Sequence, residues 1–351
     1  WIFEANEAVL SRSAGHDGHL PPIISLITRE QFRLISHEAN KPVVIQGVAG
    51  SGKTTVALHR LAWLLHADNS DAAPQRCMVV VFNRALKAYI ETTLPELGIE
   101  GVPIRTYHQW LGNIAREFGG GQPYSDFEKT RESEQFKSSP ICLNEINEYV
   151  MKFPETPEGG FAADLFRFYD YLSKRQIFWP RWEAIAKGLQ RQASSRLRDQ
   201  QDDSILLNLI FAREGHYPCK LKGALGRCDH IVIDEVQDFG VMEIRALLGA
   251  LDTDRTVTIV GDTAQKIVTN RHFGSWEELL REAGFADTTP ITLSVSHRAS
   301  EEIMKLARHI RGGAEDCDAA PMTVRHGPEP LLIKADTYEN EPYLIGRWIE
   351  E

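Results

Sequence analysis

The sequence predicts an α/β fold built on a parallel sheet, and three observations lead to this prediction. Short runs of β-branched and aliphatic residues have the composition of buried strands, since strands of a parallel sheet are covered on both faces. Amphipathic helical stretches separate these runs. A glycine-rich turn follows the first run and opens a helix, as in folds whose strands and helices alternate.

The predicted elements follow from the spacing of the apolar residues. The strands are expected at 42–46, 77–82, 230–235 and 256–261, and the clearest helices at 54–66 and 241–251.

The middle of the chain differs in character. It combines glycine- and proline-rich loops with amphipathic pieces such as 161–176 and contains no convincing strand, so we expect a helical insertion. A new strand–helix unit begins near residue 290 with "ITLSVSHRASEEIMKLARHI", and the strand "PLLIKA" follows it. The expected domains are residues 1–112 with 206–289, the insertion 113–205, and 290–351.

Composition limits the protein class. The chain has 351 residues and a formal net charge of -10, which argues against a generic polyanion binder but leaves room for a local basic groove. Its five cysteines form no CxxC pair, which indicates reduced thiols in a cytoplasmic protein without zinc. No apolar run reaches the length of a membrane span. Both ends look cut, since the chain starts at Trp1, so we expect a fragment of a longer protein, and a monomer.

The glycine-rich turn "QGVAGSGKTT" fits the phosphate-loop pattern G-x-x-x-x-G-K-[ST]. Glycines let backbone N–H groups approach phosphate oxygens at the positive end of the helix. Lys53 is expected to reach the β- and γ-phosphates of ATP, and the Thr54 hydroxyl to ligate Mg²⁺. A plain glycine-rich turn is the alternative. The expected phosphate-binding residues are Gly47, Gly50, Ser51, Gly52, Lys53, Thr54 and Thr55.

Three acids, Asp234, Glu235 and Asp238, come directly after the aliphatic run "IVI" of the strand expected at 230–235. An unpaired buried carboxylate is costly, so the arrangement indicates an opposing cation. In phosphate-loop proteins an acid at the end of a second strand holds Mg²⁺. Asp234 is the expected metal ligand, and Glu235 is expected to orient or deprotonate the attacking water. The alternative is that these acids only keep the end of the strand soluble.

Four motifs, "GVAGSGKTT", "IDEVQD", "VGDTAQ" and "LSVSHRAS", resemble those of the UvrD/Rep/PcrA helicases of superfamily 1 in order and spacing. The resemblance covers most of the chain outside the helical insertion. It implies a RecA-like phosphate-loop domain, an inserted helical subdomain and the start of a second RecA-like domain. It also implies a DNA helicase or translocase of 3′-to-5′ polarity that acts on single-stranded DNA, with RNA as the alternative strand.

The resemblance also implies roles in nucleotide binding. "ITREQFRLI" resembles the Q motif, in which Gln31 would read the adenine edge. Gln265 would sense the γ-phosphate, and Asp262 would stand near the metal-bound water. Arg298 would reach the γ-phosphate across the cleft, and His297 occupies the family's usual tyrosine position and would stack on adenine.

Nucleic-acid contacts are implied at the ends of two strands. "VFNRALKAYI" resembles the motif in which Phe82, Asn83 and Arg84 meet the strand backbone. "RTYHQWL" resembles the motif in which Thr106 and His108 contact phosphate or base. Ligands of open α/β sheets bind at this edge. Local packing of the aromatic residues is the alternative.

The chain departs from the family pattern in two ways. Val268 and Asn270 replace the aromatic residues that normally follow the glutamine motif, which puts the base-stacking pump in doubt. The arginine that stabilises the transition state is not found, so we expect this chain to bind nucleotide but hydrolyse it poorly.

Three functions remain open. A DNA helicase in repair or recombination is the first, and a remodeller bound to a protein partner such as RNA polymerase, working without unwinding, is the second. "VALHRLAWLL" and "FGSWEELL" point to the helicase IV and RNA-polymerase-recycling branch, although Trp276 is also explained as a core aromatic. An unrelated phosphate-loop kinase is the third.

Overall fold

The computed structural model describes residues 27–119, 130–218, 227–262, 275–310 and 322–331, with Pro342 and Gly346. The strands in these ranges are β1 (Val43–Gly47), β2 (Cys77–Val81), β3 (Ile104–Thr106), β4 (Cys228–Ile233), β5 (Leu251–Gly261), β6 (Ile291–Leu293), β7 (Val295–Ser296) and β8 (Met322–Thr323).

Six strands form one sheet in the order β3-β2-β4-β5-β1-β6. All of its pairings are parallel, so the carboxyl ends of these strands lie at one edge. This confirms the predicted parallel α/β fold. β5 separates β1 from β4, and the register pairs Val43 with Thr258 and Val232 with Thr258.

The helices of the described ranges are mostly amphipathic. They are α2 (Arg29–Ile35), α3 (Lys53–Leu64), α4 (Arg84–Glu96), α5 (Tyr107–Gly119), α6 (Arg131–Lys137), α7 (Pro140–Lys152), α8 (Gly160–Ser173), α9 (Trp182–Ser195), α10 (Asp202–Glu214), α11 (Val241–Leu248), α12 (Trp276–Glu282) and α13 (Glu301–Ile310), with the short 3₁₀ turns η2 (Pro74–Arg76) and η3 (Val236–Asp238).

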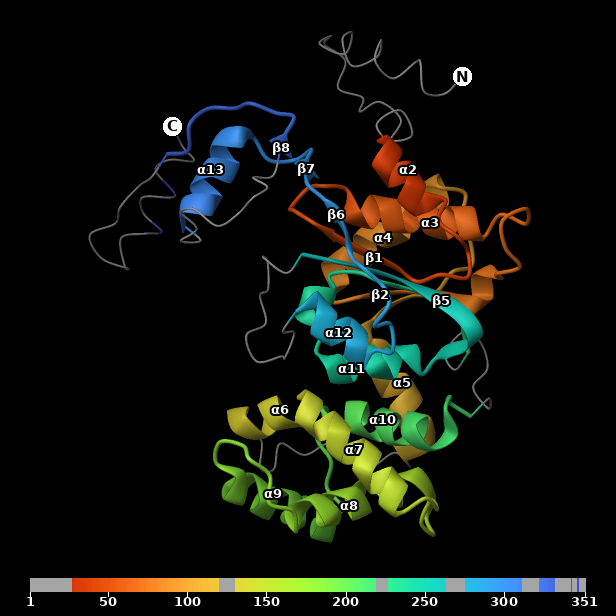
Figure 1. Cartoon of the computed structure of the whole chain (residues 1–351), viewed down its shortest axis with the longest axis vertical. Coiled ribbons are helices and arrows are strands. Elements are labelled where there is room, and N and C mark those ends of the chain that lie inside the picture. Colours follow the sequence, from red (N-terminus) through yellow and green to blue (C-terminus); the bar gives the residue numbers. More distant parts are fainter. Residues whose placement is uncertain are drawn as a thin grey trace. The chain divides into compact units, whose positions relative to one another are not determined.

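The sheet is covered on both faces, and alternate residues of each strand point into the two cores on its opposite sides. Val43 and Ile45 of β1 pack in one core with α2, α3 and α4. Val44 packs in the other core, with α5, α10, α11 and α12 (Figure 1). Helices on both faces explain why these strands read as continuous apolar runs rather than as alternating ones.

The helical stretch α6–α10 packs beyond α5 and α11 and shares the second core (Figure 1). A buried charge network lies inside it. The Lys137 ammonium contacts Asp199 at 2.7 Å and Asp202 at 2.5 Å, and the Tyr169 hydroxyl also donates to Asp202. Breaking such a buried pair by removing one partner typically costs about 3–5 kcal/mol. The network therefore ties α6 to the start of α10.

Four elements of the sheet and its helices differ clearly from expectation. The helix expected at 241–251 ends at Leu248, and β5 begins at Leu251, earlier than expected. β3 was not expected, and β6 joins the main sheet beside β1. The expected strand "PLLIKA" falls mostly outside the described residues.

The chain divides into two compact units. Unit 1 is Trp1–Gly47 with Lys53–Leu293, and unit 2 is Val48–Gly52 with Ser294–Glu351. The helical stretch α6–α10 belongs to unit 1, whose core it shares. No helix in the described part of the chain is both long and apolar enough to cross a membrane.

Candidate nucleotide site

The turn after β1 has the backbone of a phosphate loop. β1 ends at Gly47 and α3 begins at Lys53. Gly50 and Gly52 have φ values of 73° and 82°, in the left-handed region that strongly favours glycine. The Ser51 N–H closes the turn on the Val48 carbonyl at 3.1 Å, and Ser51 is buried. The backbone conformation therefore favours glycine at positions 50 and 52 of the loop.

Lys53 and Thr54 meet the sheet at the start of α3. The Lys53 ammonium donates to the Gly47 carbonyl at 2.8 Å and is buried. The Thr54 hydroxyl donates to the Asp234 carboxylate at 2.8 Å. Thr54 and Asp234 are 180 residues apart in the chain, so the fold brings together the two residues predicted to ligate a metal. Thr55 lies in the same first turn of α3, and its carbonyl contacts the His59 ring at 2.8 Å.

Asp234 is a buried carboxyl group, 1% exposed. Burial and the nearby Glu235 charge raise its pKa to about 7, against the opposing effects of the Thr54 hydroxyl and Lys53. Its other oxygen accepts the Glu235 N–H at 2.9 Å. A carboxyl group in such a place gains little by ionising unless a cation is bound nearby.

Glu235 has a left-handed backbone, with φ 54° and ψ 48°. A non-glycine residue in this region carries strain, which often occurs at functional sites. The Glu235 carboxylate accepts from the Gln237 side chain at 2.6 Å, and the Gln237 carbonyl oxygen accepts the Asp262 N–H at 2.9 Å. Gln237 therefore links the end of β4 to the end of β5.

The link through Gln237 was not predicted from the sequence. Gln237 is 2% exposed. Close packing at this link explains the glycine that ends β5, because a Cβ at Gly261 would lie 2.6 Å from a Val236 methyl group and 2.7 Å from the Gln237 side-chain oxygen. The available signal was the glutamine two residues after Glu235 within "DEVQD".

Gln31 lies on α2 and is buried. It forms a capping box with Thr28, because its side-chain oxygen accepts the Thr28 N–H at 3.0 Å and its own N–H donates to the Thr28 hydroxyl at 3.2 Å. These bonds fix the amide of the residue that was predicted to read adenine. Gln265 lies outside the described residues.

Unit 2 contains His297 and Arg298, which were also predicted to contact the nucleotide. Within this unit, the His297 N–H donates to the Gly50 carbonyl at 2.9 Å and the Ser296 hydroxyl to the Ala49 carbonyl at 2.8 Å. Burial, with Arg325 nearby, lowers the pKa of His297 and so favours a neutral ring. Arg298 is exposed. Their roles toward a nucleotide stay predictions.

The end of β2 carries the first group of predicted nucleic-acid residues. Asn83 is the N-cap of α4, and its side chain accepts the Leu86 N–H at 2.8 Å. Arg84 is exposed at the start of this helix. The half-buried Phe82 packs edge-on against Phe239, with ring centroids 5.8 Å apart. Asn83 therefore has a structural role in addition to the predicted one, and Phe82 has the packing role named as its alternative.

The end of β3 carries the second group. Thr106 is buried and exchanges long hydrogen bonds of 3.4 Å with Gln109, which cap α5. His108 is exposed and lies against the Tyr107 ring. Since β2 and β3 are neighbours in a parallel sheet, both groups share the edge at which β1 and β4 carry the nucleotide candidates.

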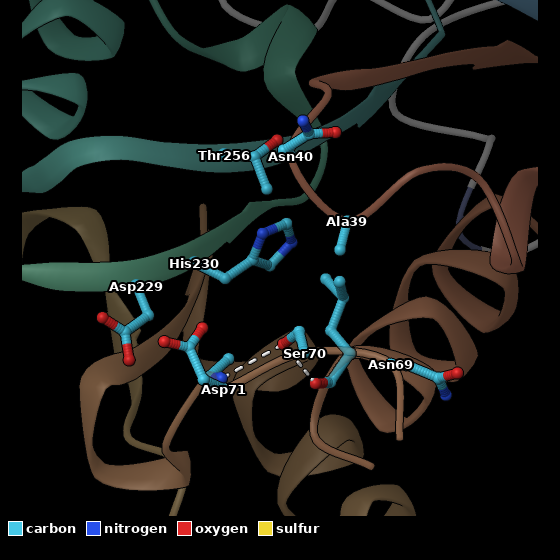
Figure 2. Close-up of a pocket in the computed structure, with 10 residues that line it drawn as sticks. Ala39, Asn40, Asn69, Ser70, Asp71, Asp229, His230 and Thr256 are labelled. Atoms are coloured by element: carbon cyan, nitrogen blue, oxygen red, sulfur yellow. Dashed lines mark hydrogen bonds between the residues drawn. The ribbon is translucent and has the colours of Figure 1, made fainter. Parts of the chain in front are cut away.

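A cavity of about 210 Å³ lies away from this edge, near the amino ends of β1 and β4 (Figure 2). His230 and Thr256 line it from the sheet, and Ala39 and Asn40 from the segment before β1. Burial lowers the pKa of His230 to about 3, and its ring contacts the Thr258 hydroxyl at 2.9 Å. Within the described residues no group of three or more His, Cys, Asp or Glu side chains is arranged to hold a metal ion.

Comparisons with known proteins identify the family. A model described as "AAA domain" matches residues 31–271, more than half of the chain. The ATP-dependent DNA helicase PcrA of Staphylococcus epidermidis is 25% identical over 283 residues, which cover 77% of this chain and 38% of that protein. The probable DNA helicase II homolog of Mycoplasma capricolum is 23% identical over 306 residues, covering 81% and 41%.

PcrA of Staphylococcus aureus is 24% identical over 281 residues, with coverage of 77% and 38%. This chain thus spans about two fifths of the length of the curated relatives that it matches. The resemblance to the UvrD/Rep/PcrA helicases is confirmed, while the nearer helicase IV branch stays a prediction. The chain belongs to the AAA domain family, in a UvrD/Rep/PcrA-like superfamily 1 form.

Proposed function

We propose that this chain binds Mg²⁺–ATP at the carboxyl edge of its sheet, as the nucleotide-binding part of an ATP-dependent superfamily 1 DNA helicase. The observation that carries the proposal is the 2.8 Å hydrogen bond between the Thr54 hydroxyl and the Asp234 carboxylate, beside the Lys53 ammonium. The AAA domain family and the DNA helicase relatives support it.

The residues of the loop fit a triphosphate. Lys53 donates to the Gly47 carbonyl at 2.8 Å, and a phosphate oxygen would replace this neutral acceptor with a negatively charged one, which gives a stronger bond. The N-terminus of α3, a helix of 12 residues, adds its unpaired N–H groups and the positive end of its dipole. The Lys53 ammonium and these N–H groups are all hydrogen-bond donors that suit phosphate oxygens.

The metal ligands fit Mg²⁺ by their chemistry. A hydroxyl and a carboxylate are the oxygen ligands that this ion prefers. Thr54 and Asp234 would hold the ion, which, when bound, neutralises charge on the phosphates. The buried Asp234 carboxyl group, with its raised pKa, is the kind of group that a cation would compensate.

Glu235 is proposed to orient the attacking water and accept its proton. Its carboxylate is held by Gln237 at 2.6 Å, and Gln237 is itself held by the backbone of Asp262. This chain of bonds places a base with a fixed orientation at the carboxyl edge. Gln265 and Arg298 are proposed to contact the γ-phosphate, and His297 to stack on the base, on the family resemblance alone.

Single-stranded DNA is proposed to cross the same edge over β2 and β3. The exposed Arg84 offers a cation to the phosphate backbone, and the exposed His108 offers a polar ring. The alternative of a partner-bound remodeller gains no support from the relatives, which are named as DNA helicases, and is not proposed.

Titration of a fluorescent ATP analogue tests the proposal. The wild-type chain should bind it in Mg²⁺ and more weakly in EDTA. Lys53→Ala should weaken binding by about 100-fold or more, because a charge-assisted contact is lost. Lys174→Ala is the matched control, since Lys174 is an exposed lysine just after α8 paired with Asp170, and it should bind like the wild type. Wild-type affinity in Lys53→Ala would remove the nucleotide site from this loop.

A further inference from the structure

Arg60 on α3 is fully buried, and its guanidinium group donates to backbone carbonyls of the segment that follows Gln31. The two shortest bonds go to the carbonyls of His37 at 2.7 Å and Glu38 at 3.0 Å. Longer bonds of 3.3–3.4 Å reach Leu34, Ile35 and Lys41. All five acceptors lie between residues 34 and 41, so one side chain fastens this whole segment to α3.

The carbonyls of Leu34 and Ile35 belong to the last turn of α2. Carbonyls in this turn lack partners within the helix, and the negative end of the helix dipole lies there. A cation is therefore well placed at this end. Burial lowers the pKa of Arg60 to about 10, which leaves the group charged at neutral pH. Arg60 thus acts on the position of α2 as well as on the turn behind it.

Part of this segment also lines a cavity. Ala39 and Asn40 line this cavity of about 210 Å³ together with His230 and Thr256 of the sheet (Figure 2). The Lys41–Glu38 ion pair at 2.9 Å also lies in this turn, but it is exposed and hence weak. A cavity supplies few packing contacts, so the five bonds to Arg60 make a large part of the attachment of this turn to α3.

α2 and α3 carry the two ends of the proposed nucleotide site. Gln31 on α2 is the proposed reader of the base, and Lys53 and Thr54 at the start of α3 are the proposed phosphate and metal contacts. We propose that Arg60 is a positioning residue for base recognition, which holds the Gln31 helix in place relative to Lys53 and Thr54 at the start of α3. This inference rests on the proposed nucleotide site.

The test compares binding of ATP with that of inosine triphosphate, which lacks the exocyclic amine of adenine. Loss of the hydrogen bond that the adenine amine would donate to the Gln31 side-chain oxygen predicts about tenfold weaker binding of inosine triphosphate to the wild type. Arg60→Met should bring this ratio close to one. It should change binding of inorganic tripolyphosphate by less than about twofold, because the loop itself is untouched. A general loss of fold would weaken all three ligands together.

Arg213→Met is the matched control. Arg213 is a second buried arginine, in the helical stretch, that bonds Asp164 at 2.5 Å and the Phe153 carbonyl at 2.7 Å. Its loss should destabilise the chain but leave the ratio near the wild-type value. If Arg60→Met does not fold, Arg60→Lys carries the test, with a ratio between those of the wild type and one.

Two outcomes overturn the inference while leaving the proposed function intact. One is an affinity ratio of ATP to inosine triphosphate that is the same in Arg60→Met or Arg60→Lys as in the wild type. The other is that the wild type binds ATP and inosine triphosphate equally well. In both cases Lys53→Ala still loses ATP binding. If Lys53→Ala binds ATP like the wild type, the nucleotide site itself fails, and the Arg60 inference falls with it.

Discussion

Replacing Asp234 by asparagine should stabilise the nucleotide-free protein at neutral pH. The carboxyl group is 1% exposed, and its pKa is raised from 3.8 to about 7 by burial and by the Glu235 charge. Asparagine keeps the shape of the side chain but carries no charge. Its oxygen accepts the Glu235 N–H in place of the 2.9 Å carboxylate bond, and its NH2 group donates to the Thr54 hydroxyl, which in the wild type donates to Asp234 at 2.8 Å. The change therefore removes the ionisation of Asp234 and little else.

The size of the effect follows from the two pKa values. The unfolded chain loses the Asp234 proton near pH 4, whereas the folded chain keeps it up to about pH 7. Asp234 therefore does not lower the free energy of unfolding of the wild type below pH 4, and it lowers this free energy progressively as the pH rises to about 7. The total is about 4 kcal/mol, at about 1.4 kcal/mol per pKa unit. Between pH 5 and 8 it is about 2.5 kcal/mol.

The assay is urea unfolding of both proteins at pH 5, 6, 7 and 8. The free energy of unfolding of Asp234→Asn minus that of the wild type should grow by about 2.5 kcal/mol across this range. Groups that titrate in both proteins, such as His230, cancel in the difference. Saturating Mg²⁺ and ATP analogue should reduce the difference, since a bound cation compensates the carboxylate.

Asp229→Asn is the control of opposite sign. Asp229 is also buried on β4, but its carboxylate pairs with Arg76 at 2.8 Å, so its loss should destabilise the protein at neutral pH. Parallel pH curves for Asp234→Asn and the wild type would refute the reasoning. They would mean that the Asp234 carboxylate is already satisfied without a cation.

Two further predictions concern catalysis and nucleic acid. In the full-length protein, Glu235→Gln should keep binding of the ATP analogue within about twofold. It should lower phosphate release in the presence of single-stranded DNA by about 10²-fold or more, because a glutamine cannot accept the proton. Equal release in a single-turnover assay would assign the base elsewhere. Arg84→Ala should lower the salt slope of single-stranded DNA binding by about 0.7, as for one lost phosphate contact, whereas Arg33→Ala, an exposed arginine on α2, should not. A wild-type salt slope in Arg84→Ala would mean that the DNA does not cross β2. Asn83 is better changed to serine than to alanine, since loss of the α4 cap would cost about 1 kcal/mol of stability.

Local sequence patterns were sufficient for much of the sheet and for the centre of the site. β1, β2 and β4 lie within a residue or two of their predicted bounds, because buried parallel strands read as aliphatic runs. The phosphate loop and Asp234 were predicted from motif spacing, and the structure brings Thr54 and Asp234 together.

Other features had no local signal. β3 is only three residues long, and the first part of β5, "LDTDR", is too polar to read as a strand. The bond of Gln237 to the backbone of Asp262 joins two strand ends 25 residues apart, and Arg60 reaches carbonyls 19 to 26 residues away. Such contacts depend on which elements become neighbours in the fold, and periodicity along the chain carries no information about that.

The most direct measurement is a crystal structure of the chain grown with Mn²⁺, in place of Mg²⁺, and a nonhydrolysable ATP analogue. We predict an anomalous Mn²⁺ peak beside the Thr54 hydroxyl and the Asp234 carboxyl group, with the phosphates on the backbone of residues 47–54. A manganese peak elsewhere, or phosphates bound away from that loop at full occupancy of the analogue, would contradict the account.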